Sequence, residues 1–195
     1  MISPLAALGS ADAWLLLKIN RDWASPALDS VMPVFTNLQK VPWFIYGVAP
    51  AAIGLWLWKG RKHALKVLVV AAIAMGASDF VAYHAIKPWA ARPRPEYSVS
   101  GVDVRVPNGG RYGFPSNHAA NSAAAAAVLS VAYPGGTILF AAVAAAVAYS
   151  RVYVGAHYPG DALAGLALGM AIGWPWAVLM LGGSGGSGKK KRSRA

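Results

Sequence analysis

Long, almost uncharged apolar stretches constrain this chain more than any other feature of its sequence. Five of them approach the roughly 20 residues that a helix needs to cross a bilayer, at 41–58, 64–86, 118–133, 137–152 and 161–181. Backbone groups inside a bilayer must bond to one another, which favours helices. Hydrophobic residues make up 56% of the chain and charged residues 13%, against about 25% charged in soluble domains. We therefore expect an all-α, polytopic membrane helical bundle with about five to six transmembrane helices.

The apolar stretches also divide the chain into three parts. Residues 1–40 hold only short apolar segments, so we expect N-terminal interfacial helices there, one of them beginning at Ser25-Pro26. Residues 41–181 form the predicted transmembrane domain. Residues 182–195 begin with a Gly/Ser linker and end in a basic run, which predicts a flexible tail on anionic lipid headgroups. A tail that only adds solubility is the alternative.

Charge and cysteine content exclude several classes of protein. The chain has 18 Lys and Arg against 7 Asp and Glu, a formal charge of +11. In so apolar a chain, this charge favours anionic lipid and phosphate as partners and not nucleic acid. The absence of cysteine excludes a disulfide scaffold, a Cys-ligated metal and a thiol nucleophile. With five spans, the basic cluster at 59–66 and the tail share one side, which we expect to be cytoplasmic.

Three polar islands interrupt the apolar sequence, at 87–95, 114–118 and 150–161. The first closes the second apolar stretch and the second opens the third. The stretches at 118–133 and 137–152 are joined by Pro134-Gly135-Gly136 and are expected to form a hairpin, which returns the chain to the same membrane face at the third island. The islands should therefore gather six ionisable residues at one depth: Lys87, Arg94, His118, Arg151, His157 and Asp161.

Such a cluster has the chemistry of a phosphoryl-transfer site. Cations, together with the free N–H groups of a helix that begins near Ser116 and Asn117, would bind phosphate oxygens. One histidine can attack phosphorus and another can protonate the leaving oxygen. We expect His157 to be the nucleophile, held by Asp161 four residues later, and His118 to be the acid.

Other interpretations of the same residues remain open at this stage. A single Lys or Arg near the end of a span usually extends to the interface, which is the expectation for Lys18, Lys40 and Arg105. Asp79 lies about two helical turns before Lys87 and is predicted either to orient Lys87 or only to pair with it. A small-anion transporter would also carry intramembrane cations, although it should distribute them through the membrane.

The three islands resemble the signature motifs of the type 2 phosphatidic acid phosphatase superfamily. The chain has Lys87 followed after six residues by Arg94-Pro95, then Pro115-Ser116-Asn117-His118, and then Ser150-Arg151 with His157 and Asp161 at the family spacing. Asn117 replaces the glycine of the second motif, which puts the local geometry of that motif in question.

The resemblance implies hydrolysis through a phosphohistidine, without a metal or another cofactor. The resemblance implies that His157 is the nucleophile and that Asp161 orients it. It implies that His118 is the acid for the leaving group and then the base for the hydrolytic water. The implied substrate-binding residues are Lys87, Arg94, Ser116, Asn117 and Arg151.

The compact membrane form is most similar to the bacterial undecaprenyl-diphosphate phosphatases of cell-wall biogenesis. That similarity implies a multi-pass protein of the bacterial inner membrane with its active site on the periplasmic face and a membrane lipid phosphate as substrate. Phosphatidylglycerophosphate, phosphatidate and lipid A phosphatases share the motifs and are alternatives. Vanadate haloperoxidases also share them, but the apolar stretches argue against a soluble enzyme. The sequence sets no oligomeric state.

Overall fold

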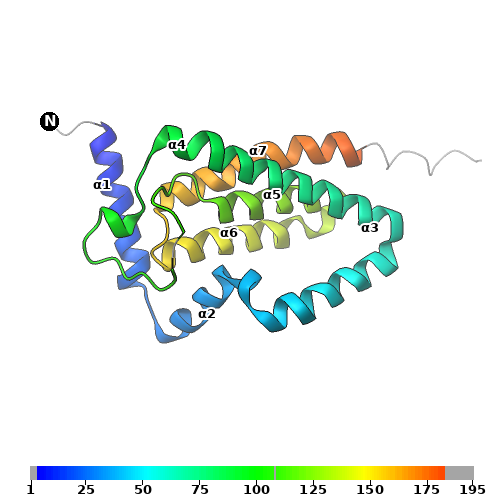
Figure 1. Ribbon diagram of the computed structural model, residues 1–195, viewed down its shortest axis with the longest axis horizontal. Helices are drawn as coiled ribbons and strands as arrows, with labels where there is room; N and C mark the ends of the chain where they lie inside the picture. The colour runs from blue at the N-terminus through cyan, green and yellow to red at the C-terminus, as the bar shows by residue number, and fades with distance from the viewer. Residues whose placement is uncertain (1–3, 108, 183–195) are drawn as a thin grey trace, which may run out of the picture.

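The N-terminal part of the chain consists of short helices. The structure is a computed structural model that describes residues 4–107 and 109–182 (Figure 1). Helix α1 spans Pro4–Leu17 and continues into the π-helical turn η1, Lys18–Asp22. Helix α2 spans Pro26–Thr36 and is followed by a 3₁₀ turn η2, Leu38–Lys40. The Ser25 hydroxyl accepts a hydrogen bond from the Leu28 N–H at 3.4 Å, which confirms the predicted helix start.

The longest helical segment folds back on itself. It begins with η3, Phe44–Val48, runs through α3, Ala49–Phe80, and continues through η4, Val81–Ile86, into α4, Lys87–Ala90. Arg61 has a φ of 43°, a value outside the helical region, and divides α3 into two arms. The chain turns back at this break, so that the two arms form an open V (Figure 1). The break falls inside the basic cluster that separates the first two predicted spans.

Three further helices complete the bundle. Helix α5 spans Asn117–Ala132, α6 spans Thr137–Tyr153 and α7 spans Pro159–Leu181. The turn η6, Pro134–Gly136, joins α5 to α6 as the breaker predicts, and the two helices lie antiparallel (Figure 1). Three segments are long and apolar enough to cross a membrane: Phe44–Ala90, Pro134–Tyr153 and Pro159–Leu181. The protein is thus an all-helical membrane protein, and the number of five to six spans stays a prediction.

The centre of the bundle is the contact between α5 and α7. Most alanines of α5 are buried, as their small size predicts. Helix α7 faces them with Gly165, Gly169 and Gly173, one turn apart. A Cβ atom on Gly169 would collide with the backbone carbonyl of Ala120, and one on Gly173 would lie 2.6 Å from the carbonyl of Ala124. Glycine is therefore what lets the two backbones approach so closely.

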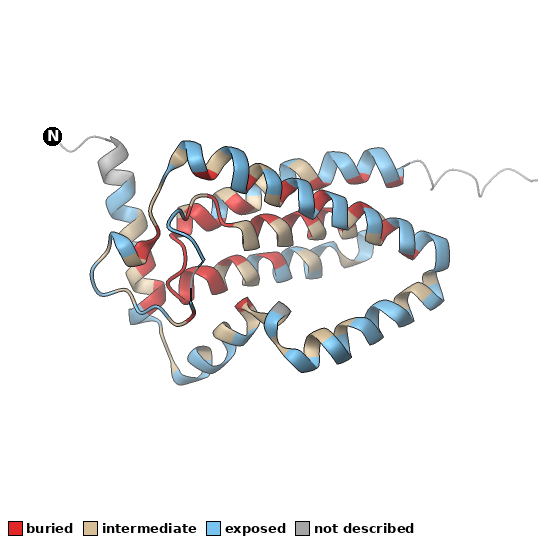
Figure 2. Cartoon of the chain, viewed as in Figure 1, coloured by how far each residue is buried: buried red, intermediate tan, exposed pale blue. Residues whose placement is uncertain are grey.

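Buried residues concentrate at one end of the bundle, where loops join the helices (Figure 2). The loop that leads from α4 to α5 contains the 3₁₀ turn η5, Pro95–Tyr97, and an isolated β-bridge between Pro93 and Tyr112. No strand occurs in the part of the chain that the structure describes. The predicted basic tail, from residue 183 onward, lies outside the described residues.

Candidate active site

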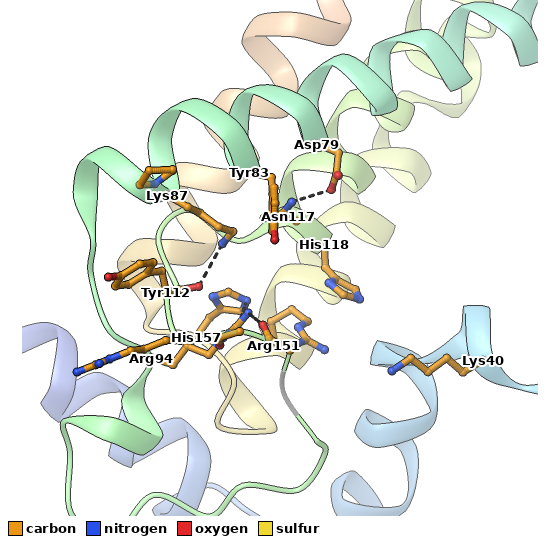
Figure 3. Close-up of a pocket in the computed structure, with 14 residues that line it drawn as sticks. Lys40, Asp79, Tyr83, Lys87, Arg94, Tyr112, Asn117, His118, Arg151 and His157 are labelled. Atoms are coloured by element: carbon orange, nitrogen blue, oxygen red, sulfur yellow. Dashed lines mark hydrogen bonds between the residues drawn. The ribbon is translucent and has the colours of Figure 1, made fainter.

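A cavity of about 660 Å³ opens at this loop-rich end of the bundle (Figure 3). Its walls come from η4 and α4, from the first turn of α5, from the last turn of α6 and from the loops around residues 109–112 and 157. Five basic residues and one acidic residue line it: Lys40, Lys87, Arg94, Arg111, Arg151 and Asp79. The cavity therefore suits an anion.

The structure brings the predicted site residues together from all three islands. The ones that line the cavity are Lys87, Arg94, Asn117, His118, Arg151 and His157. His118 and His157 both face the same space (Figure 3). Asp161 is fully buried and lies beyond His157, outside the lining. Ser116 is buried with no hydrogen-bond partner for its hydroxyl and does not line the cavity, so its contact with substrate stays a prediction.

His157 lies in the short connection between α6 and α7, and two local features fix its position. Gly155 has a φ of +77°, and a Cβ there would lie 2.7 Å from the carbonyl oxygen of Asp103, so this turn requires glycine. Asp161 lies in the first turn of α7, where its Oδ2 accepts the N–H of Tyr158 at 3.1 Å. The same Oδ2 lies 3.6 Å from Nδ1 of His157. His157 and Asp161 therefore face each other as the spacing predicts, at a separation longer than a hydrogen bond.

The contacts of His157 also define its tautomer. Nε2 lies 3.0 Å from NH1 of Arg94, and a guanidinium can only donate, so Nε2 must accept. The proton of the neutral ring is then on Nδ1, which faces Asp161. A histidine nucleophile needs this arrangement, with a lone pair toward the cavity and an N–H toward a carboxylate.

Burial and surrounding cations keep His157 neutral. Burial lowers the pKa of His157 well below its usual value, and the charges of Arg94, Arg151 and Lys87 lower it further. A neutral imidazole keeps a lone pair on Nε2, which can attack at neutral pH once the contact with Arg94 is released.

Two of the cations also organise the backbone around the cavity. Lys87 donates to the carbonyl of Pro115 at 2.7 Å and to that of Gly113 at 3.3 Å, which fixes the approach to α5. Arg151 donates from NH1 to the hydroxyl of Thr36, the last residue of α2, at 2.7 Å, and its buried Nε has no partner. An unpartnered guanidinium N–H beside an anion cavity is available for a phosphoryl oxygen.

Asp79 does not orient Lys87 through a hydrogen bond. Its Oδ1 accepts from the Asn117 amide at 2.7 Å and from the Asn121 amide at 3.4 Å, whereas Lys87 donates to carbonyls (Figure 3). Asn117, the residue that departs from the motif, therefore joins the first turn of α5 to the second arm of α3.

Sequence reasoning missed several residues near the site. Arg92 binds Asp161 at 2.7 Å and Asp12 of α1 at 2.6 Å. Lys40, expected to extend to the interface, lines the cavity instead. Arg92 lies inside the first motif, so its position in the sequence could have indicated a role at the site. Asp12 and Lys40 lie far from all three islands, and no spacing marks them.

The fold and the site together define a class of protein. Cations surround a neutral histidine that is backed by a carboxylate, at one end of an all-helical membrane bundle, as in an enzyme that transfers phosphoryl groups. The chain belongs to the PAP2 superfamily, whose sequence profile matches residues 63–182.

Curated relatives and solved structures agree with this assignment. The chain is 33% identical over 177 residues to lipid A 4'-phosphatase of Bacteroides thetaiotaomicron, with 86% of this chain and 76% of that protein covered. It is 36% identical over 124 residues to decaprenylphosphoryl-5-phosphoribose phosphatase of Mycobacterium tuberculosis, covering 62% of this chain and 66% of that protein.

A crystal structure of a PAP2-type phosphatidylglycerolphosphate phosphatase from Bacillus subtilis superposes with a TM-score of 0.64 at 26% identity, covering 87% of this chain and 84% of that chain. The protein is thus a phosphoric ester hydrolase of the membrane lipid phosphatase branch.

Proposed function

We propose that this protein removes a phosphoryl group from a membrane lipid through a phosphohistidine on His157. The observation that carries the proposal is the arrangement of His157, whose Nε2 faces a cationic cavity while its Nδ1 faces the buried carboxylate of Asp161. The phosphoryl oxygens would bind Arg94, Lys87 and Arg151, which neutralise the charge that spreads over them during transfer.

The first half-reaction transfers the phosphoryl group to the enzyme. Nε2 of His157 attacks phosphorus, and the bond between phosphorus and the lipid oxygen breaks. His118, which takes up a proton when the negative charge of the substrate phosphate enters the cavity, donates that proton to the oxygen as it leaves. The contact between Arg94 and Nε2 is replaced by a contact between Arg94 and the phosphoryl group. Asp161 stabilises the positive imidazole of the phosphohistidine.

The second half-reaction regenerates the enzyme. His118, now neutral, takes a proton from water while the water oxygen attacks phosphorus. The bond between phosphorus and Nε2 breaks, its electron pair returns to the imidazole, and inorganic phosphate leaves. The cavity cations supply the positive charge in both steps, so we propose that no metal or other cofactor is needed.

Two classes of lipid are the candidate substrates. The compact membrane form favours undecaprenyl diphosphate, which would be converted to the monophosphate at the periplasmic face of a bacterial inner membrane. The relatives favour phosphate monoesters, because they are named as phosphatases of lipid A, of decaprenylphosphoryl-5-phosphoribose and of phosphatidylglycerolphosphate. We propose both classes for direct comparison.

The test is phosphate release by purified protein in detergent and EDTA from undecaprenyl diphosphate, a lipid A phosphate and phosphatidylglycerophosphate. We expect release from at least one lipid, and a loss of about 10³-fold or more in kcat for His157→Ala. Phosphohistidine hydrolyses in acid, so the phosphoenzyme is measured after an alkaline quench with labelled substrate.

The role of His118 has a separate test. His118→Ala should slow phosphoenzyme formation much less with an aryl phosphate, whose leaving oxygen needs no proton, than with a lipid phosphate. Release from no lipid phosphate by wild type, or full activity in His157→Ala, would overturn the proposed function.

A further inference from the structure

A chain of polar contacts runs from helix α1 to the imidazole of His157. Asp12 Oδ2 binds Arg92 NH2 at 2.6 Å, Arg92 NH1 binds Asp161 Oδ1 at 2.7 Å, and Asp161 Oδ2 faces His157 Nδ1 at 3.6 Å. We propose that Asp12 and Arg92 are positioning residues for the His157–Asp161 pair. The inference rests on the proposed function, because it concerns the same phosphohistidine chemistry.

Arg92 assigns a separate task to each oxygen of Asp161. It occupies Oδ1, which leaves Oδ2 for the Tyr158 N–H and for the imidazole. Gly113 permits this placement, since a Cβ there would lie 2.9 Å from Oδ2. The carboxylate is therefore held in one rotation, with Oδ2 toward His157.

Arg92 also supplies the counter-charge that a buried carboxylate needs. The Asp161 side chain is fully buried, whereas Arg92 is 28% exposed. A carboxylate without a cation at such a site would lose its charge. Only the ionised form of Asp161 stabilises the positive phosphoimidazole, so Arg92 supports the step in which His157 carries the phosphoryl group.

Arg92 is itself held by two neighbours. Its guanidinium carbon lies 4.0 Å from the centre of the Tyr158 ring, and its NH2 binds Asp12. Burial disfavours its charge, but Asp161 and Asp12 together more than offset this and raise the pKa of Arg92 above its usual value. Arg92 thus remains a cation throughout the reaction.

Asp12 connects Arg92 to the helix that carries Asp161. Its Oδ1 accepts the N–H of Gly160, in the first turn of α7, at 2.8 Å. A Cβ on Gly160 would lie 2.8 Å from Asp12 Oδ2, so glycine permits this approach. One carboxylate of α1 therefore fixes both the guanidinium and the start of α7, and α1 is part of the catalytic apparatus.

Neither Asp12 nor Arg92 lines the cavity, so neither is in place to bind substrate. Their loss should therefore lower kcat and leave KM nearly unchanged. A tie that only fastened α1 to the bundle would instead lower thermal stability, with no specific effect on phosphoenzyme formation. This difference separates the two explanations.

The first experiment compares Arg92→Ala with wild type in detergent, on a lipid phosphate that the wild type hydrolyses. We expect kcat to fall by about 100-fold, phosphoenzyme formation in single turnover to slow equally, and KM to stay within roughly threefold. Guanidinium at millimolar concentration should restore about tenfold of the lost rate, whereas urea, which has a similar shape and no charge, should not. Arg92→Lys should retain more activity than Arg92→Ala.

Arg105→Ala is the matched control. Arg105 also binds a carboxylate, Asp29, at 2.7 Å and also lies over a tyrosine ring, that of Tyr153, at 4.7 Å, but it has no contact with Asp161. Its kcat should stay within about threefold of wild type.

A second variant separates the charge of Asp12 from its hydrogen bond to α7. Asp12→Asn keeps an oxygen for the Gly160 N–H and removes the charge beside Arg92, so we expect a loss of about 5- to 20-fold in kcat. Full kcat in folded Arg92→Ala, or a loss that guanidinium does not restore, would overturn the inference. An inactive wild type would overturn the proposed function instead.

Discussion

The first arm of α3, residues 49–60, and the end of the bundle around His157 are built in opposite ways. Leu55 and Trp58 on the arm are 51% and 73% exposed, and a Cβ on Gly54 would meet nothing within 4 Å. At the other region Asp161 is fully buried and bonded on both oxygens. The arm therefore depends on apolar character alone, whereas the site depends on particular atoms at particular distances.

The comparison shows where exact residue identity matters in a membrane protein. Lipid is as apolar as leucine, so an exposed apolar side chain contributes little to helix association. Close backbone packing and satisfied polar groups must hold the helices together instead. Substitutions should therefore be tolerated on the arm and should be costly at the contact between α5 and α7 and at the site.

The largest expected effect comes from a glycine of the helix contact. Gly169→Val places a side chain where the backbone of Ala120 lies, so α5 and α7 must separate. Overpacking of this kind costs about 1–3 kcal/mol or more, and a backbone clash belongs to the upper end. We expect folded protein in detergent to fall below roughly a tenth of the wild-type yield, measured by size-exclusion chromatography.

Gly54→Val on the arm is the control for this substitution, because it adds the same side chain where there is space. Its yield and its melting temperature should match the wild type. Equal losses in the two variants would contradict the distinction between the arm and the α5–α7 contact.

The next effect concerns the charges around His157. The groups that face it are Arg94, Arg151, Lys87, His118 and Asp161. Arg94→Gln removes a cation that lowers the pKa of His157, so this pKa should rise toward about 6.5. Protonation inactivates the nucleophile, and the acid-side fall in kcat/KM should therefore begin at higher pH than in wild type. The value at neutral pH should also drop by about 100-fold, because a phosphoryl ligand is lost.

The measurement is a profile of kcat/KM from about pH 5 to 8, with the rate of phosphoenzyme formation as a second readout. Lys62→Gln, on the exposed turn between the arms of α3, is the control and should keep the wild-type profile. An Arg94→Gln profile with an unshifted acid side would show that Arg94 does not set the charge state of His157.

Much of the fold was predictable because it follows from local sequence. The break at 59–62, the helix start at Ser25-Pro26 and the hairpin at Pro134–Gly136 each lie where charges, a cap or a breaker place them. The burial of α5 followed from its alanines. The close approach of Gly169 to Ala120 was harder to foresee, because it depends on which helix faces α7 and at which register.

The site was predictable only as far as the motifs extend. The predicted hairpin returns the chain to the same membrane face, which predicted that His118, Arg151 and His157 lie together. The structure places all three at one cavity. Asp12 and Thr36 lie on helices more than 50 residues before Lys87, where the first motif begins. They reach the site through side-chain geometry that no spacing encodes. Long-range pairs of this kind appear only once the helices are packed.

The smallest expected effect is at Asn117, which lines the cavity and also binds the second arm of α3. Asn117→Gly restores the family residue and removes the 2.7 Å hydrogen bond to Asp79 on α3. The backbone N–H that would contact phosphate remains, so kcat should change by less than about fivefold. Loss of one bond to a carboxylate should lower stability by about 1–2 kcal/mol, measured as a shift in melting temperature.

Asn121→Ala is the matched control, because its bond to the same Asp79 oxygen is longer, at 3.4 Å. It should lower stability less than Asn117→Gly does, since a bond of that length is weak. A fall in kcat of more than roughly 50-fold in folded Asn117→Gly would show that this side chain acts on the reacting group. The expected result would instead assign Asn117 to the packing of α5 against α3, so that the site tolerates a change in its second motif while the cations and the His157–Asp161 pair stay in place.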